Sequence, residues 1–206
     1  MKIRRRGKAI LVLLAAGAGA VAFARQGLYP FLARHEPVRA EVLVVEGWLG
    51  DEMLDRAMEW AEANGAKTVV ATGGPIETGS WLAEWGSLAE MTKARLAARG
   101  YGDRFEIEAA PAPGARRGRT RASARALKER YGERLGAFNL ASEGPHVRRS
   151  WRAFRAEFGE IAEVGSVALE PTEYGPDDWW TCSEGVRAMV GELVAYAYDA
   201  LAGGRE

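Results

Sequence analysis

The sequence predicts an α/β domain of three layers, with a mostly parallel sheet of five strands between helices. Two observations carry this prediction. Short apolar runs alternate five times with longer stretches of helical periodicity. The first run, 42–45, is apolar at every residue, as expected of a strand buried on both faces. Strands joined by helices form parallel, right-handed βαβ units. We therefore expect a Rossmann-like sandwich over residues 41–206, with strand order 3-2-1-4-5.

The first βαβ unit has the clearest pattern. A helical stripe follows the first strand and consists of Met53, Leu54, Ala57, Met58 and Ala61. A second strand is expected at 68–71, and the segment 72–75, Thr-Gly-Gly-Pro, ends it in a turn. The first strand also ends near a glycine, in Glu46-Gly47. Both turns then lie at the carboxyl edge of the sheet, where open α/β sheets bind ligands.

The later elements follow the same alternation. Further strands are expected at 105–107, 136–141 and 164–169. Further helices are expected at 82–100, 120–132, 147–158 and 183–201, and Thr120 is expected to cap the second of these. The helix at 147–158 should bury Val147, Trp151, Phe154 and Phe158. The last helix should bury Val186, Met189, Val190, Leu193 and Ala197.

The amino terminus predicts a membrane segment. Five basic residues lie within residues 1–8, and 9–24 carry no charge. We expect a basic cytoplasmic terminus at 1–8, a transmembrane anchor at 9–28 and a linker at 29–40, although Ala22-Phe23-Ala24 leaves a cleaved signal peptide open. The charge bias predicts a single-pass protein of the inner (cytoplasmic) membrane, with its domain on the periplasmic, outer side.

The composition limits the classes of ligand and partner that we expect. The chain of 206 residues has 28 basic and 28 acidic residues, so no excess of positive charge points to nucleic acid. One cysteine and two histidines give no recognisable metal-ligand set. The expected partners are membrane lipid, through the amino-terminal helix, and a small anionic ligand.

The predicted topology brings four distant segments to one crevice. Their candidate ligand-binding residues are Glu46, Gly47, Thr72, Gly73, Gly74, Thr120, Ser142, His146 and Arg149. Glu46 and His146 are also the candidate catalytic residues, because a carboxylate and an imidazole can transfer protons. Plainer roles stay open: the glycines suit an ordinary turn, the histidine a helix start, and Glu46 an ion pair. Ser142 lacks the GxSxG spacing of a hydrolase nucleophile.

Three of these segments resemble a known family: Val69-Val70-Ala71-Thr72-Gly73-Gly74, the helix start at Thr120, and Ala141-Ser142 with His146-Val147-Arg148-Arg149-Ser150. In order and spacing they resemble the ElyC/SanA/YdcF family of bacterial envelope proteins, over about residues 40–165. The resemblance implies a role in cell-envelope or peptidoglycan homeostasis, a membrane-anchored form like the SanA-like members, and S-adenosylmethionine as a candidate cofactor. A nucleotide is the other candidate, which the glycine turns and arginines at the switch point suggest. This chain has Thr-Arg-Ala-Ser-Ala at 120–124, where the family commonly has Thr-x-Glu-Asn-Ala.

Two classes of function follow. The first is a membrane-anchored module that binds a phosphorylated or nucleotide-like ligand at the switch point of the sheet; the missing dyad, nucleophile elbow and metal triad favour it. The second is an envelope enzyme acting on a phosphorylated cell-wall lipid intermediate or a nucleotide-like substrate. Glycine turns, arginines and a histidine converging at one switch point favour the enzyme. The sequence leaves open whether the protein is an enzyme.

Overall fold

The computed structural model describes residues 2–201, without the side chains at 2–7, 9, 10, 13, 18, 20, 21 and 133. Its centre is a sheet of five parallel strands in the order β3-β2-β1-β4-β5, which confirms the predicted α/β fold and strand order. The strands are β1 (Val42–Glu46), β2 (Thr68–Gly73), β3 (Glu106–Pro111), β4 (Ala137–Glu143) and β5 (Glu163–Leu169).

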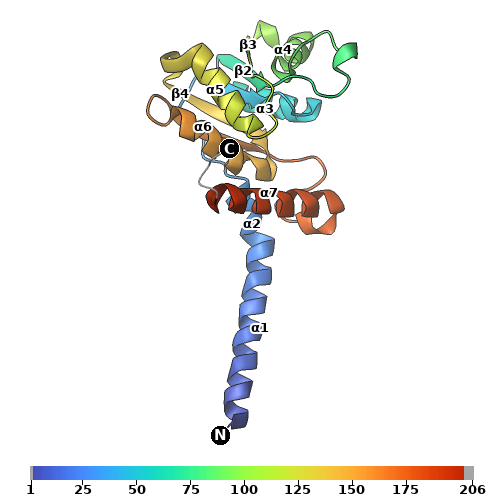
Figure 1. Ribbon diagram of the computed structural model, residues 1–206, viewed down its shortest axis with the longest axis vertical. Coiled ribbons are helices and arrows are strands. Elements are labelled where there is room, and N and C mark those ends of the chain that lie inside the picture. Colours follow the sequence, from blue (N-terminus) through green and yellow to red (C-terminus); the bar gives the residue numbers. More distant parts are fainter. Residues whose placement is uncertain (1, 202–206) are drawn as a thin grey trace.

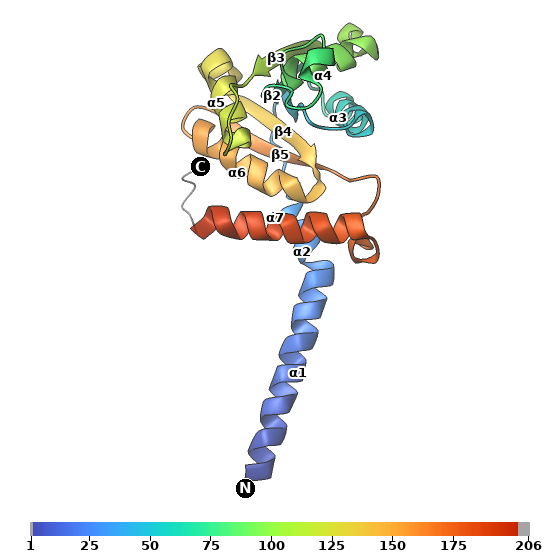
Figure 2. The same cartoon turned by 45° about the vertical axis from the view of Figure 1, so that its right-hand side comes forward.

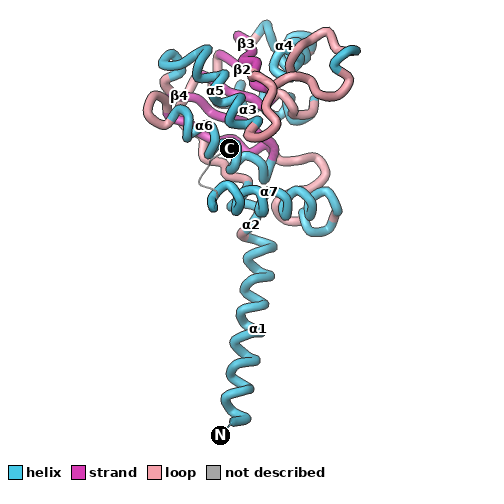
Figure 3. Tube along the Cα trace, in the orientation of Figure 1, coloured by secondary structure: helices cyan, strands magenta, loops and turns pink. Residues whose placement is uncertain are grey.

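Helices cover both faces of the sheet (Figures 1 and 3). The helices are α1 (Lys2–Gln26), α2 (Leu28–Leu32), α3 (Asp51–Ala63), α4 (Leu88–Ala98), α5 (Arg119–Tyr131), α6 (Val147–Phe158) and α7 (Ser183–Leu201). One hydrophobic cluster joins the sheet to α3 and to Leu96 of α4, and a second joins the opposite face to α5 and α6. β1 supplies Leu43 and Val45 to the first cluster and Val44 to the second. This alternation explains why the strand is apolar at every position.

The register of the strands sets the edge at which a ligand could bind. Glu46, the last residue of β1, lies opposite Thr72 of β2, and Val45 lies opposite Ala141 of β4. The chain runs outward from β1 to β3 and then returns to the other side of β1 to form β4. The carboxyl ends of β1 and β4 therefore flank the switch point.

The predicted core face of α6 is largely confirmed. Val147, Phe154 and Phe158 are fully buried. Trp151 is only half-buried: its Nε1 donates to the Val164 carbonyl over 2.7 Å, and the guanidinium of Arg34 lies 3.7 Å from the ring centroid.

The helix predicted at 82–100 begins later, at Leu88. Ser87 caps it: its Oγ accepts from the Glu90 N–H over 3.1 Å and donates to the Glu90 carboxylate over 2.8 Å. The sequence has the S-x-x-E spacing of a capping box, although the Glu90 carboxylate accepts here from the Ser87 hydroxyl and not from its backbone N–H. The cap starts the helix after the apolar residues Trp81 and Leu82. Those two side chains are 88% and 86% exposed.

Thr120 does not cap α5. The N-cap is Gly118, in the left-handed region at φ 62°, so the helix starts at Arg119 and Thr120 lies within its first turn. Glycine takes this conformation without the steric cost that a side chain would add, which is why the chain turns into the helix there.

The side of α7 that was predicted to be buried is exposed, so this prediction is wrong. Of the five side chains expected to be buried, only Met189 is; Val186, Val190, Leu193 and Ala197 are exposed. Because α3 with α4 and α5 with α6 already cover the two faces of the sheet, α7 has no face left to cover. It packs instead beside α2 in a third cluster that includes Leu32, Trp179 and Met189.

The amino-terminal helix α1 projects from the domain beside α7 (Figures 1 and 2). Within the described residues, no helix combines the length and apolar character needed to cross a membrane, so the transmembrane anchor predicted at 9–28 lacks support from the structure. Part of the predicted linker at 29–40 folds onto the domain. Tyr29 and Leu32 of α2 are buried, and the Asn139 side chain bonds both backbone groups of Val38 over 2.8 Å.

We predict that Phe154→Ala lowers the free energy of unfolding by about 3–5 kcal/mol, because the ring is fully buried between α6 and the sheet. The matched control is Leu82→Ala, whose exposed side chain predicts a change within about 0.5 kcal/mol. Urea unfolding followed by circular dichroism measures both. Equal effects of the two substitutions would show that α6 does not cover the sheet.

Candidate functional site

A groove of about 1240 Å³ opens at the carboxyl edge of the sheet, at the switch point between β1 and β4. Among the residues that line it are Glu46, Thr72, Gly73, Gly74, Thr120, His146 and Arg149, all predicted site residues. The other two predicted residues, Gly47 and Ser142, are buried and do not line the groove. One wall comes from α6 and α7, and another from the loop at 115–118 and the start of α5.

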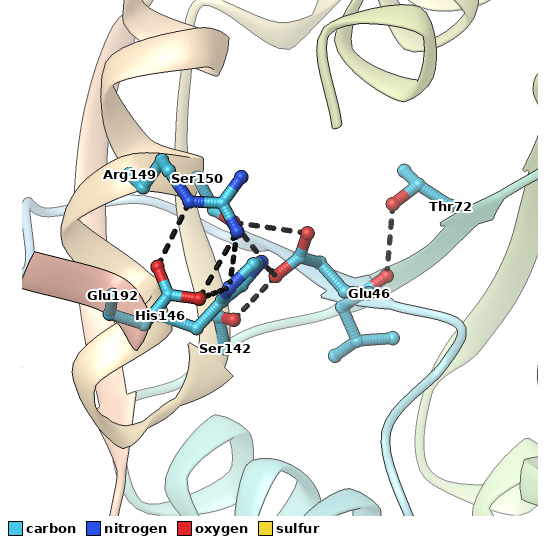
Figure 4. A network of polar contacts seen from close by, with 8 residues as sticks. Glu46, Thr72, Ser142, His146, Arg149, Ser150 and Glu192 are labelled. Carbon is cyan, nitrogen blue, oxygen red and sulfur yellow. Dashed lines mark hydrogen bonds and ion pairs between the residues drawn. The ribbon is translucent and has the colours of Figure 1, made fainter. Parts of the chain in front are cut away.

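Glu46 lies at the centre of this site as a nearly buried carboxylate, 4% exposed. Ser142 at the end of β4 donates a hydrogen bond to its Oε2, and Ser150 of α6 lies 3.0 and 3.1 Å from its two oxygens (Figure 4). Both serines are fully buried. A carboxylate in the interior requires such donors, because an unsatisfied buried charge is strongly destabilising. Ser142 therefore holds Glu46 in place instead of presenting a nucleophile to the groove.

His146 lies between two carboxylates. Its Nδ1 is 2.8 Å from Glu192 Oε1, and its Nε2 is 3.8 Å from Glu46 Oε2 (Figure 4). Because a carboxylate only accepts, Nδ1 carries a proton and donates to Glu192. The Nη2 of Arg149, 3.1 Å from Nδ1, then bonds Glu192 and not the ring. Glu192 thus fixes the imidazole with Nε2 directed towards Glu46.

The charges of this cluster shift the pKa values of its members. Burial lowers the pKa of His146, but the carboxylates of Glu46 and Glu192 raise it by more, so the pKa lies above its ordinary value. Burial raises the pKa of Glu192, but hydrogen bonds from His146 and Arg149 outweigh burial and bring it down to about 2. Glu192 is therefore ionised at neutral pH, and the cluster favours the protonated form of His146.

Part of the Arg149 guanidinium group is already bonded to Glu192. Its Nε donates to Glu192 Oε2 over 2.9 Å and its Nη2 to Oε1 over 3.1 Å, a bidentate pair. Its Nη1 makes no hydrogen bond to any residue that the structure describes. Arg149 therefore keeps one donor group for a ligand in the groove, instead of the bidentate clamp that its residue type suggests.

The three predicted glycines have different roles. A Cβ at Gly47 would lie 2.6 Å from the Thr72 carbonyl oxygen, and a Cβ at Gly73, where φ is 153°, would lie 2.8 Å from Leu88 Cβ. Packing alone explains both residues. At Gly74, however, the nearest atom to an added Cβ is 3.7 Å away. Because a side chain would fit there without a clash and Gly74 lines the groove, Gly74 is the glycine whose backbone a ligand could approach.

Arginines line the wall opposite α6 and α7. Arg116 and Arg117 are exposed and form no ion pair with any described residue. Arg119 pairs with Glu77 over 3.3 Å, and Arg121 with Glu157 over 2.6 Å. Acidic residues, Glu143 and Asp199, line the groove elsewhere, and burial followed by the nearby Glu173 raises the pKa of Glu143. The groove thus offers unpaired positive charge on one side and acidic groups on another.

Sequence reasoning missed two members of the cluster, Ser150 and Glu192. Ser150 lies in the first turn of α6, four residues after His146, which directly precedes the helix; this spacing places both side chains on one side of the helix start. Glu192 and Arg187 are the two charged residues within the otherwise uncharged stretch 186–198. Glu192 could therefore be noticed in the sequence as an isolated acidic residue, but its partners His146 and Arg149 could not be predicted from it. No group of three or more His, Cys, Asp or Glu side chains among the described residues could hold a metal ion.

Comparison with known proteins adds no identification. Neither a scan of protein-family models nor a search of curated proteins found a match for this chain. The resemblance to the ElyC/SanA/YdcF family therefore stays a prediction.

We predict that Glu192→Gln lowers the pKa of His146, because it removes one of the two carboxylates that oppose the effect of burial. Proton NMR of the imidazole measures this, in a His35→Ala background that leaves a single histidine. Glu184→Gln is the matched control: it is on the same helix, and its carboxylate bonds Ser183 and Arg187 instead. An unchanged pKa in Glu192→Gln would mean that Glu192 does not hold the ring.

Proposed function

We propose that the groove binds a small anionic ligand, phosphorylated or nucleotide-like. The observation that carries this is the set of unused donors around one cavity: the Arg116 and Arg117 guanidinium groups, Nη1 of Arg149 and the accessible backbone at Gly74. Guanidinium groups and backbone N–H groups are the donors that phosphate and carboxylate oxygens prefer. The position at the switch point of a parallel sheet supports the same proposal.

The broader role that we propose is support of cell-envelope or peptidoglycan homeostasis by a membrane-associated binding module. The resemblance of three segments to the ElyC/SanA/YdcF family supports it. The basic residues within 1–8, the uncharged stretch 9–24 and the exposed apolar side chains of α1 support the membrane association.

An enzyme acting on a phosphorylated cell-wall lipid intermediate or a nucleotide-like substrate is the second candidate. One observation favours it: His146 is fixed by Glu192 at Nδ1 and directs Nε2 to Glu46 at the groove. A carboxylate that fixes one imidazole nitrogen and leaves the other for proton transfer is a recurring arrangement of general acid–base catalysis. Conversion of a bound ligand by the wild type but not by His146→Gln would select this candidate.

We predict that Gly74→Val abolishes ligand binding without unfolding the protein, because the new side chain enters the groove and not the core. A thermal-shift screen with nucleotides, S-adenosylmethionine and polyprenyl phosphates first identifies a binder; saturation at 100 times Kd stabilises by about 2.7 kcal/mol. That stabilisation should be lost in Gly74→Val and reduced in Arg116→Ala and Arg117→Ala.

The control for this experiment is Gly102→Val. An added Cβ at Gly102 meets no atom within 4 Å, so this substitution is tolerated as the one at Gly74 should be, but Gly102 does not line the groove. Binding that survives in Gly74→Val as well as in Gly102→Val would place the ligand elsewhere.

We predict that alkaline phosphatase fused after Glu206 is active, because the basic residues ahead of the uncharged stretch favour an amino terminus held in the cytoplasm. A fluorescent protein fused at the same site should stay dark if the carboxyl terminus is exported. A fluorescent fusion with an inactive phosphatase would overturn the proposed location.

A further inference from the structure

One face of α7 is apolar and exposed. It consists of Val186, Val190, Leu193, Val194, Tyr198 and Leu201, which are 39–89% exposed. Their spacing places them on one side of the helix. Within 190–201, the only charged residues are Glu192 and Asp199, and both line the groove. The exposed face of this half of the helix therefore carries no charge.

The opposite side of α7 ties the helix to the domain. Gly185 and Met189 are its buried residues. Glu192 bonds His146 and Arg149, and the Tyr196 ring meets Phe31 edge to face at 5.2 Å. The helix is thus two-sided, with the site on one side and an apolar surface, which we call the α7 apolar face, on the other.

The α7 apolar face has apolar surface beside it. In both views α1 leaves the domain next to α7 and α7 lies across its end (Figures 1 and 2). Leu11, Val12, Leu14 and Phe23 of α1 are 59–68% exposed. At the junction, the guanidinium of Arg25 lies 5.2 Å from the centroid of the Trp180 ring.

We propose that the α7 apolar face docks on the surface of a lipid bilayer, with α7 lying in the plane of the headgroup boundary. From Val190 onwards α7 has a charge-free apolar side, which Arg187 precedes on the same side of the helix, and its polar side stays with the protein. Such a helix suits this boundary, where amphipathic helices bury their apolar side by about 5–10 Å and keep basic residues near the headgroups. Aromatic Tyr198 fits the same boundary, because tyrosine is enriched there. The exposed side of α7 over 190–201 carries no charged residue, whereas the rim of a protein–protein interface is polar.

Docking would place the groove at the headgroup layer. Ala188, Glu192 and Asp199 of α7 line the groove, so the helix that meets the lipid also forms a wall of the site. The ligand class then narrows to an anionic headgroup carried on a lipid; this last step rests on the function proposed above, whereas the docking itself does not.

The test uses the full chain in vesicles of phosphatidylethanolamine and phosphatidylglycerol. Cys182, the only cysteine, is replaced by serine, and a nitroxide label is attached at Ala197→Cys on α7 or, as matched control, at Ala97→Cys on α4. Both alanines are exposed on helices, and α4 lies at the other end of the domain from α7 (Figures 1 and 2). Electron paramagnetic resonance then compares collisions of each label with oxygen, which enters lipid, and with a water-soluble nickel chelate.

The expected result is that oxygen collisions dominate at 197 and nickel collisions at 97. In a protein that also carries Val194→Glu, nickel collisions should dominate at 197, and the free energy of unfolding should not change. The proposal is overturned if both labels report water. It is also overturned if the label at 197 shows spin–spin broadening that dilution with unlabelled protein removes, because a second copy would then cover the face. No ligand is present in this measurement. A negative result would therefore contradict the docking proposal alone, whereas the thermal-shift test decides on ligand binding.

Discussion

The buried carboxylate of Glu46 constrains the rest of the site. It ends the central strand β1 at the switch point, and a polar group buried there requires hydrogen-bond donors around it. The donors come from different elements: Ser142 from β4, and Ser150 from α6. Satisfying one carboxylate therefore fixes the end of β4 and the first turns of α6 relative to β1, and it brings His146 to within 3.8 Å of the same carboxylate.

The constraint continues outward through His146. Its second nitrogen requires a partner, and Glu192 of α7 supplies it, itself held by Arg149. Acidic and basic side chains alternate from Glu46 through His146 and Glu192 to Arg149, so each acidic group has a basic neighbour. In a low-dielectric interior such a network is worth more than its separate pairs. It also connects the centre of the sheet to the helix for which we propose contact with lipid.

The sequence allowed the fold and the edge of the site to be predicted, because βαβ alternation fixes parallel pairing and parallel strands end together. It did not allow the facing of α7 to be predicted. A helical stripe shows that Val190 and Leu193 share a side, but not whether that side meets the protein. Glu192 was missed for a related reason: its bond to His146 spans 46 residues, and no local pattern encodes it. Ser87 and Glu90, by contrast, gave a local signal that corrects the start of α4.

The central claim, that Glu46 and His146 interact directly at the switch point, is tested most directly by a double-mutant cycle of Glu46→Gln and His146→Gln. The free energy of unfolding of the four proteins, measured in urea at one pH below neutrality, gives the coupling between the two side chains. The pair at 3.8 Å predicts a coupling of about 0.5–3 kcal/mol that favours the native protein. Effects that add to within about 0.3–0.5 kcal/mol would show that the two groups act independently, and would contradict this account.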